Sequence, residues 1–233
     1  MYFDYTYVIY VLPAVILAMI ASMKVNSTFR RYRAQLSRRG LTGAGAARAV
    51  LDANGLRNVR IEHVSGNLTD HYDPRTNVIR LSDSVYSSTS TAAIGVAAHE
   101  AGHAVQYAVR YAPIKLRTAI VPVTQIGSRL AIPLVLLGLL FSLFSPELVV
   151  ISYIGIGCFA LSTVFQLVTL PTEFNASRRA MAAIRAQNLL DEDELAGARK
   201  TLTAAAMTYV AALAVSLGQL LRLLSIVSRR DRD

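Results

Sequence analysis

The chain has 233 residues, 53% of them hydrophobic and only 17% charged, with a mean hydropathy of +0.40. This composition is too apolar for an ordinary soluble domain and indicates a membrane protein. A net charge of +9 also occurs in nucleic-acid-binding proteins. Here, however, Lys24 and the arginines between positions 30 and 39 follow an apolar segment, and no nucleic-acid motif accompanies them. We therefore expect contact with the lipid bilayer and no nucleic-acid partner.

The first apolar run covers residues 5 to 23 and is long enough to cross a bilayer with some tilt. Asp4 precedes it, and no small-residue cleavage site follows, so residues 1–23 are predicted to be an uncleaved transmembrane anchor. Basic residues follow the run and none precedes it. The positive-inside rule then places the N-terminus outside the cell and Lys24 onward in the cytoplasm.

A polar segment, residues 24–117, is predicted to be a cytoplasmic domain that leans on the membrane helices for part of its core. Thr42 can cap a short helix that Asn54 and Gly55 end. Val59, Ile61 and His63 alternate along the chain, and a turn follows at Asp73 to Asn77, which predicts two or three short antiparallel strands. These strands are expected at 58–64, 67–73 and 78–82.

A helix from about Thr91 to Val109 carries the motif His99-Glu100-Ala101-Gly102-His103. Residues four apart lie on one face of a helix, so His99 and His103 can bind a single metal ion. Glu100 then stands where a general base can reach a metal-bound water. This HExxH pattern is typical of zinc metallopeptidases, and the order of helix, small sheet and metal-binding helix is that of a zincin domain, whose edge strand can pair with an extended substrate.

The rest of the chain is apolar except for one polar segment. Residues 118–170 are predicted to form a transmembrane hairpin, with arms at 130–146 and 148–170 and a turn at Ser145 to Glu147. The single cysteine, Cys158, lies in this region, so no disulfide or thiolate zinc cluster is expected. The remaining divisions are a polar helical segment at 171–200, a fourth span at 201–228 and a charged tail at 229–233. Four crossings would leave the basic tail outside, against the usual bias, so the fourth segment either crosses as an exception or packs without crossing.

Catalytic zinc usually takes three protein ligands, so the two histidines need a third. Between Glu100 and Asp191 the only acidic residues are Glu147 and Glu173, and no histidine follows His103. One membrane crossing separates His103 from Glu147, whereas two crossings return Glu173 to the side of the motif. In isolation Glu173 would be interpreted as a charge near a helix start. Together with the motif, it is predicted to be the third ligand.

The chain resembles the YugP-like family of bacterial membrane zinc metallopeptidases, and more distantly the HtpX-like and prenyl-protein membrane proteases. The resemblance rests on LTDHYDPRTNVIRLS, AAIGVAAHEAGHAVQ and EFNASRRA, at residues 68–82, 92–106 and 173–180. The order of the predicted spans extends it over nearly the whole chain. The expected fold is an α+β membrane protein in which a small zincin-like domain is fused to about four transmembrane helices.

This resemblance implies a gluzincin-type endopeptidase that uses one zinc ion to cleave peptide or membrane-protein substrates. His99, His103 and Glu173 would be the ligands and Glu100 the catalytic base. In the broader gluzincins an Asp four residues after the ligand Glu orients a zinc-bound His. Here that position is Ser177, a weaker hydrogen-bond acceptor.

Other roles remain open at this point. A metallopeptidase needs a further donor for the oxyanion besides the metal. The candidates are His71, Tyr72, Tyr107 and Arg178, for each of which packing or a loop role is an equal alternative. Asp70 and Asp73 are interpreted as turn residues rather than metal ligands, and His63 as a strand residue.

Two other functions compete with a surface endopeptidase of the bacterial inner membrane. The first is an intramembrane, site-2-like metalloprotease, but the Ala-rich motif helix is bounded by Arg110 and the polar SSTST run and is too short to span. The second is a non-catalytic zinc-stabilised scaffold or chaperone. The intact Glu100 argues against it, because a structural site needs no base.

Overall fold

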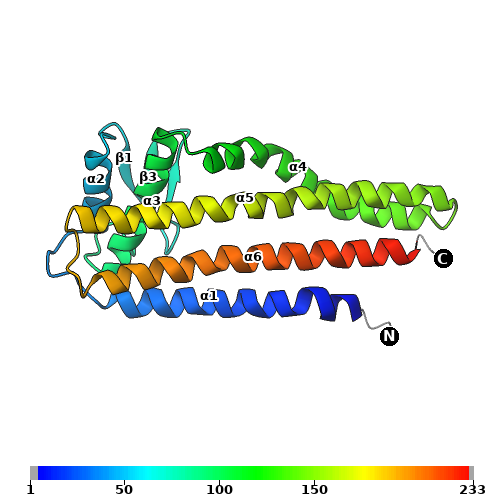
Figure 1. Cartoon of the computed structure of the whole chain (residues 1–233), viewed down its shortest axis with the longest axis horizontal. Helices are drawn as coiled ribbons and strands as arrows, with labels where there is room; N and C mark the ends of the chain where they lie inside the picture. Colours follow the sequence, from blue (N-terminus) through cyan, green and yellow to red (C-terminus); the bar gives the residue numbers. More distant parts are fainter. Residues whose placement is uncertain (1–4, 231–233) are drawn as a thin grey trace. The chain divides into compact units, whose positions relative to one another are not determined.

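The structure, a computed structural model, describes residues 5–230. Asp4 and the last three residues of the predicted tail lie outside this range. The chain forms, in order, a π-helical turn η1 (Tyr7–Val11), α1 (Leu12–Arg33), α2 (Gly43–Ala53), β1 (Arg60–Val64), β2 (His71–Asp73), β3 (Val78–Ser82), α3 (Thr91–Ala108), α4 (Ala112–Phe141), a 3-10 turn η2 (Pro146–Val149), α5 (Val150–Ala186) and α6 (Leu195–Arg230) (Figure 1).

Four helical stretches are long and apolar enough to cross a membrane: 7–33, 112–141, 146–186 and 195–230. With the small sheet, they confirm the expected α+β membrane fold. Each helix is longer than the apolar run that predicted it. α1 continues through basic residues to Arg33, and α4 begins at Ala112. Because long helices tolerate charged ends outside the hydrocarbon, helix length exceeds span length here.

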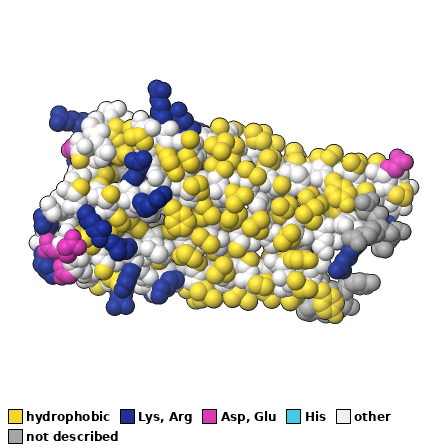
Figure 2. Space-filling view, in the orientation of Figure 1, with side chains coloured by type: hydrophobic (Ala, Val, Ile, Leu, Met, Phe, Trp, Pro, Cys, Tyr) yellow, Lys and Arg dark blue, Asp and Glu magenta, His cyan; other side chains and the backbone are white. Residues whose placement is uncertain are grey.

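The chain forms two compact units, and the first contains 5–21, 116–170 and 208–230. Its core is a small cluster of buried aliphatic side chains from α4, η2, α5 and α6, such as Val135, Ile156 and Val227. Apolar side chains cover much of the visible surface of these helices (Figure 2). Leu136 of α4, for example, has 60% of its surface exposed. An apolar exterior is what a lipid-facing helix bundle requires.

Polar contacts and small residues hold the first unit together. The Ser152 hydroxyl of α5 donates to the Val135 carbonyl of α4 at 2.9 Å, and the hydroxyls of Thr163 and Ser216 join α5 to α6 at 2.7 Å. Gly155 lies against the α4 backbone, where a side chain would collide. Small residues and interhelical hydroxyl bonds are the usual means of packing helices within lipid.

The second unit contains residues 22–115 and 171–207. Its sheet has the order β1-β3-β2, with β2 antiparallel to β3 and β1 parallel to β3. The expectation of a wholly antiparallel sheet is therefore wrong for β1. Its connection to β3 passes through β2 on the far side of β3, and this arrangement makes β1 run alongside β3 in the same direction. β1 and β2 are the two edges.

The predicted helix ends in this unit are confirmed. The Thr42 hydroxyl accepts from the Gly45 amide at 3.1 Å at the start of α2. Gly55 follows with a φ of +73°. Ser90 caps α3 in the same way, accepting from the Ala93 amide at 3.2 Å. These caps satisfy amide groups that the first helical turn leaves unpaired.

α3 is the centre of the second unit's core. The core combines α2, β3, α3 and the facing parts of α5 and α6, with fully buried side chains that include Leu51, Ile79, Ile94 and Ile184. Gly95 of α3 lies against Ala198 of α6 so closely that a methyl group there would be 3.2 Å from the Ala198 Cα. Alanine and glycine on α3 thus bring its backbone near its neighbours, which fixes the positions of the motif side chains.

An ionic network joins the loop after α1 to the loop before α6. The guanidinium of Arg38 pairs with Asp193 and, at 3.1 Å, with Asp191, while the Arg38 amide donates to buried Glu194 at 2.8 Å. The pairing with Arg38 lowers the pKa of Asp193. Acidic and basic side chains are visible side by side over this part of the unit (Figure 2). The network ties two loops that are distant in sequence.

Candidate metal centre

Three side chains from two helices of the second unit converge on one point. His99 and His103 lie one turn apart on α3, with ring centroids 4.7 Å apart. Glu173 comes from α5, and its Oε2 is 3.2 Å from His99 Nε2 and 3.5 Å from His103 Nε2. All three ligand atoms lie within 4.8 Å of one another, so together they could hold a metal ion.

Hydrogen bonds on the far side of each imidazole orient the two rings. The Ser177 hydroxyl lies 3.1 Å from His99 Nδ1, and the Gln106 carbonyl oxygen Oε1 accepts from His103 Nδ1 at 2.9 Å. Both Nε2 atoms therefore face Glu173. Ligand atoms around tetrahedral zinc, at 2.0–2.1 Å from the metal, are about 3.3 Å apart. The observed 3.2 and 3.5 Å match that spacing, so the residues present fit a zinc ion.

The three side chains are largely buried, and carboxylates lie beside the imidazole of His103. Glu173 is only 2% exposed and His103 9%. Burial acts to lower the pKa of His103, but its hydrogen bond to Glu173 and the nearby carboxylates of Glu100 and Glu173 outweigh this effect and raise it. A buried carboxylate against two imidazoles needs a compensating positive charge. A divalent cation or protonated histidines can supply it.

Gln106 is a residue at this site that the sequence reasoning missed. It is fully buried, and its amide nitrogen donates to the Thr172 carbonyl at 2.8 Å and to Asn175 Oδ1 at 3.0 Å. It thus joins His103 of α3 to the start of the Glu173 segment of α5. Its position three residues after His103, on the same helical face, was the signal that could have indicated it.

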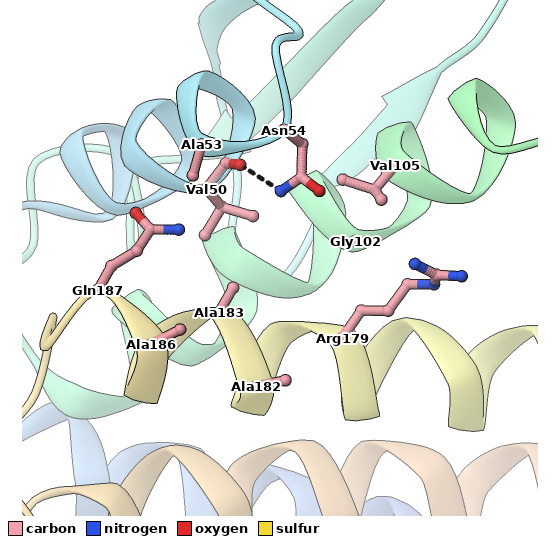
Figure 3. A pocket seen from close by; sticks show the side chains of 10 residues that line it. All are labelled: Val50, Ala53, Asn54, Gly102, Val105, Arg179, Ala182, Ala183, Ala186 and Gln187. Carbon is pink, nitrogen blue, oxygen red and sulfur yellow. Dashed lines mark hydrogen bonds between the residues drawn. The ribbon is translucent and has the colours of Figure 1, made fainter.

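The hydrogen-bonded chain continues to Arg179. Its Nε donates to Asn175 Oδ1 at 2.8 Å, the same atom that accepts from Gln106. Arg179 also lines a cavity of about 350 Å³ between α2, α3 and α5, into which its guanidinium extends (Figure 3). His103, Gln106, Asn175 and Arg179 therefore form a continuous polar line from the candidate metal centre to this cavity.

Glu100 lies on α3 beside the cluster and is 8% exposed. Among residues 5–230 its carboxylate forms no hydrogen bond or ion pair. Asp70, which precedes β2, lies close enough to Glu100 for the two carboxylates to repel each other. Burial first, and then repulsion from Glu100, raise the pKa of Asp70. Asp70 accepts hydrogen bonds from the amide and hydroxyl of Ser82 at 2.7 and 3.0 Å, so it ties the start of β2 to the end of β3.

The side chains predicted as possible oxyanion donors do not all lie beside the candidate metal centre. His71 lies exposed on β2, with Nδ1 donating to the Thr69 carbonyl at 2.8 Å. The Tyr72 hydroxyl donates to Asn77 Oδ1 at 2.9 Å, and its ring packs edge-on against Tyr107 at 5.6 Å. Arg178 is exposed on α5, and its side chain forms no hydrogen bond or ion pair with any residue in 5–230.

Two residues interpreted from sequence as structural have structural contacts. His63 lies on β1, where its Nε2 is 2.6 Å from Asp83. Asp73 ends β2 and accepts from the Arg75 amide and the Thr76 hydroxyl, as a turn residue does. Neither belongs to the group of side chains that could hold a metal.

The fold and this cluster define a class: a multi-pass membrane protein with a candidate metal centre of two histidines and a glutamate. Comparison with known families gives a more specific assignment. The chain belongs to the family described as "Putative neutral zinc metallopeptidase", whose model matches residues 7–228. It is 46% identical over 218 residues to a protein described as "Putative membrane protease YugP" from Bacillus subtilis (strain 168), covering 91% of this chain and 93% of that relative. No solved structure matches the chain.

Proposed function

We propose that the protein is a membrane-anchored zinc-dependent endopeptidase of the gluzincin type. His99, His103 and Glu173 are the zinc ligands and Glu100 is the general base. The observation that carries the proposal is the approach of Glu173 Oε2 to both Nε2 atoms, at 3.2 and 3.5 Å, although Glu173 is 74 residues after His99 in the chain. Family membership supports zinc as the metal.

In this mechanism each residue has one task. Zinc, when bound, acts as a Lewis acid toward the scissile carbonyl and makes water more acidic. Glu100 accepts a proton from the attacking water at its carboxylate and delivers it to the leaving amine nitrogen. Its lack of a hydrogen bond among residues 5–230 supports this role, because a base must be available to water. Ser177 and Gln106 hold the two imidazoles in the orientation that turns Nε2 toward the metal.

The sheet suggests where an extended substrate would bind. β2 is an edge strand that contacts α3, the helix of the motif. An extended peptide can add to such an edge by backbone hydrogen bonds, which brings its scissile bond toward Glu100. His71 and Tyr72 lie on this edge strand, and Tyr107 of α3 packs against the Tyr72 ring, so we propose these three side chains as donors for the oxyanion.

We place the protein in the bacterial cell membrane with the N-terminus outside and the metal centre on the cytoplasmic side. Lys24 and the arginines that follow the first apolar run support this orientation through the positive-inside rule. A reporter that is active only in the cytoplasm, fused after Arg39, tests it. An inactive reporter on a normally produced fusion protein would overturn the orientation without affecting the metal site.

The central experiment compares zinc content and peptide cleavage in the wild type and in the variants Glu100→Gln and Glu173→Ala. Glu100→Gln should keep its zinc and lose cleavage by about 100-fold or more, because it retains shape but not basicity. Glu173→Ala should lose zinc. If the wild type and Glu100→Gln bind zinc equally and neither cleaves a casein or membrane-protein substrate, the scaffold function replaces the enzymatic one.

A further inference from the structure

A second cavity in the same unit lies between α5 and α6 and has a volume of about 380 Å³. We call it the α5–α6 groove. One set of its lining residues is cationic and consists of Arg178, Arg185 and Arg199. Basic side chains with apolar ones between them are visible over these stretches of α5 and α6 (Figure 2). The groove is thus an amphipathic surface rather than an apolar one.

Within the part of the chain that the structure describes, the side chains of these three arginines are unpaired. All are exposed, and among residues 5–230 none forms an ion pair or a side-chain hydrogen bond. Between Pro171 and Ala186 the only acidic residue of α5 is the buried Glu173, and 195–207 of α6 contains no acidic residue at all. Three like charges around one groove repel each other unless an anion is bound. The groove therefore matches a ligand with negative charge.

The other lining residues match a hydrocarbon. Phe174 of α5 and Leu202 and Ala206 of α6 form the apolar part of the groove. Phe174 is 41% exposed, an unusual position for an aromatic ring unless it meets lipid or a ligand. An anionic ligand that also carries an apolar tail would satisfy both parts.

The order of these residues along the helices gives the ligand a direction. Phe174 lies next to the apolar run of α5, which ends near position 170, and Ala206 lies within the uncharged run of α6 that begins at position 201. Arg185 and Arg199 are at the other end of the groove. Along the axis of α5, Arg185 is about 16 Å from Phe174. A lipid with its tail toward the apolar runs would bring its headgroup to the arginines, in the way basic pockets between membrane helices bind anionic headgroups.

We propose that the α5–α6 groove binds an anionic phospholipid, with the phosphate at Arg185 and Arg199 and an acyl chain along Phe174 and Ala206. The groove adjoins the candidate metal centre through Ser177, which is among its lining residues, but the phospholipid contacts proposed here involve neither the metal ligands nor Glu100. Each arginine close to a headgroup contributes about fivefold to binding. Loss of both is therefore expected to weaken phospholipid binding about 25-fold.

The test uses the full chain in a neutral detergent, with phosphatidylglycerol or phosphatidylcholine of identical acyl chains. Native mass spectrometry counts retained lipid, and thermal unfolding gives the shift in midpoint. The wild type should retain phosphatidylglycerol in preference to phosphatidylcholine, and Arg185→Gln/Arg199→Gln should lose this preference. The matched control, Arg57→Gln/Arg75→Gln, removes two exposed arginines elsewhere in the unit and should keep it. Thr203→Trp fills the groove while retaining every arginine and should also reduce binding.

Several outcomes would overturn the proposal. Equal retention of the two lipids by the wild type is one, and equal behaviour of the two double variants is another. A midpoint shift with inorganic phosphate alone that matches the lipid shift would show a simple anion site. If an acidic peptide binds the wild type but not Arg185→Gln/Arg199→Gln, while phosphatidylglycerol does not discriminate between them, the groove is a peptide site.

Discussion

Gly102 of α3 lies directly against Ala176 of α5: a methyl group on Gly102 would be 2.8 Å from the Ala176 carbonyl oxygen. Gly102 immediately precedes His103, and Ala176 lies between Glu173 and Ser177. The two helices are therefore closest where the proposed ligands meet. The absence of a side chain at position 102 sets the distance across the cluster.

Gly102→Ala is predicted to separate the helices and to weaken zinc binding. Overpacking of a close helix contact costs about 1–3 kcal/mol in the free energy of unfolding. Thermal unfolding and a zinc competition titration measure the two effects. Gly157→Ala is the matched control, since Gly157 is also helical, on α5, but has open space around the position of a Cβ. It should be neutral or slightly stabilising because alanine favours helix. Equal effects of the two substitutions would contradict the spacing role of Gly102.

Gln106→Leu is predicted to weaken zinc binding about 10- to 100-fold, the range found when the residue that orients a metal-bound histidine is removed. The substitution preserves volume but deprives His103 Nδ1, the Thr172 carbonyl and Asn175 of a buried partner. Each unpaired buried group costs about 1–3 kcal/mol. Zinc affinity is measured by chelator competition and stability by thermal unfolding.

The control for Gln106→Leu is Gln106→Glu, which keeps an acceptor for His103 but loses the donor to Thr172 and Asn175. Zinc binding should recover in part, while stability remains low. If Gln106→Leu lowered stability and left zinc affinity unchanged, the residue would have a packing role alone.

Ser177→Ala is predicted to reduce zinc affinity about tenfold, because His99 Nδ1 loses its hydrogen bond at 3.1 Å. Ser177→Asp offers a charged acceptor at the same position and should bind zinc at least as tightly as the wild type. Titrations of both variants with a zinc chelator decide the point. If Ser177→Asp bound zinc more weakly than Ser177→Ala, the Ser177 hydroxyl would not act as a hydrogen-bond acceptor that orients His99.

Asp73 is predicted to stabilise the sheet in a way that depends on pH. Hydrogen bonds from the Thr76 hydroxyl and the Arg75 amide lower its pKa to about 2 in the folded chain. A carboxyl whose pKa is lowered by folding adds stability that is complete above its ordinary pKa of about 3.9. That stability is lost as the pH falls toward 2. The difference in thermal midpoint between wild type and Asp73→Asn should thus be constant above about pH 5 and shrink below pH 4.

Glu192→Gln is the control for the pH experiment, because Glu192 is exposed and forms no hydrogen bond with residues 5–230. Its midpoint difference from the wild type should not vary over the same range. A difference for Asp73→Asn that persists unchanged down to pH 2 would contradict the role of its carboxylate.

Local patterns predicted the parts of the fold that local interactions determine. Thr42 and Gly55 are helix-end signals whose physics lies within a few residues, and α2 begins and ends close to where those signals stand. The turn between β2 and β3 is another case, since Asp73 makes its own turn contacts. Glu173 was predicted to be the third ligand by a different argument, elimination among the acidic residues together with the count of membrane crossings, which needs no detailed geometry.

Interactions between distant segments were not predictable in the same way. The direction of β1 depends on which neighbour it pairs with, and alternation in residues 58–64 is the same for parallel and antiparallel pairing. The spacing of Gln106 from His103 could indicate the bond to that histidine, but its bonds to α5 could be recognised only once α5 was placed beside α3, because two of its three partners lie there. The full lengths of α1 and α4 were missed because hydropathy reports the lipid-embedded portion of a helix and not its polar continuation.

The second unit is built from two stretches of chain, 22–115 and 171–207, with the hairpin residues 116–170 between them. During synthesis the histidines therefore leave the ribosome well before Glu173 does. A nascent chain that stops within the hairpin has the proposed base and two of the proposed ligands but not the third, so it cannot complete the proposed metal centre. Any activity that needs this centre should then arise only after residues 116–170 have been synthesised.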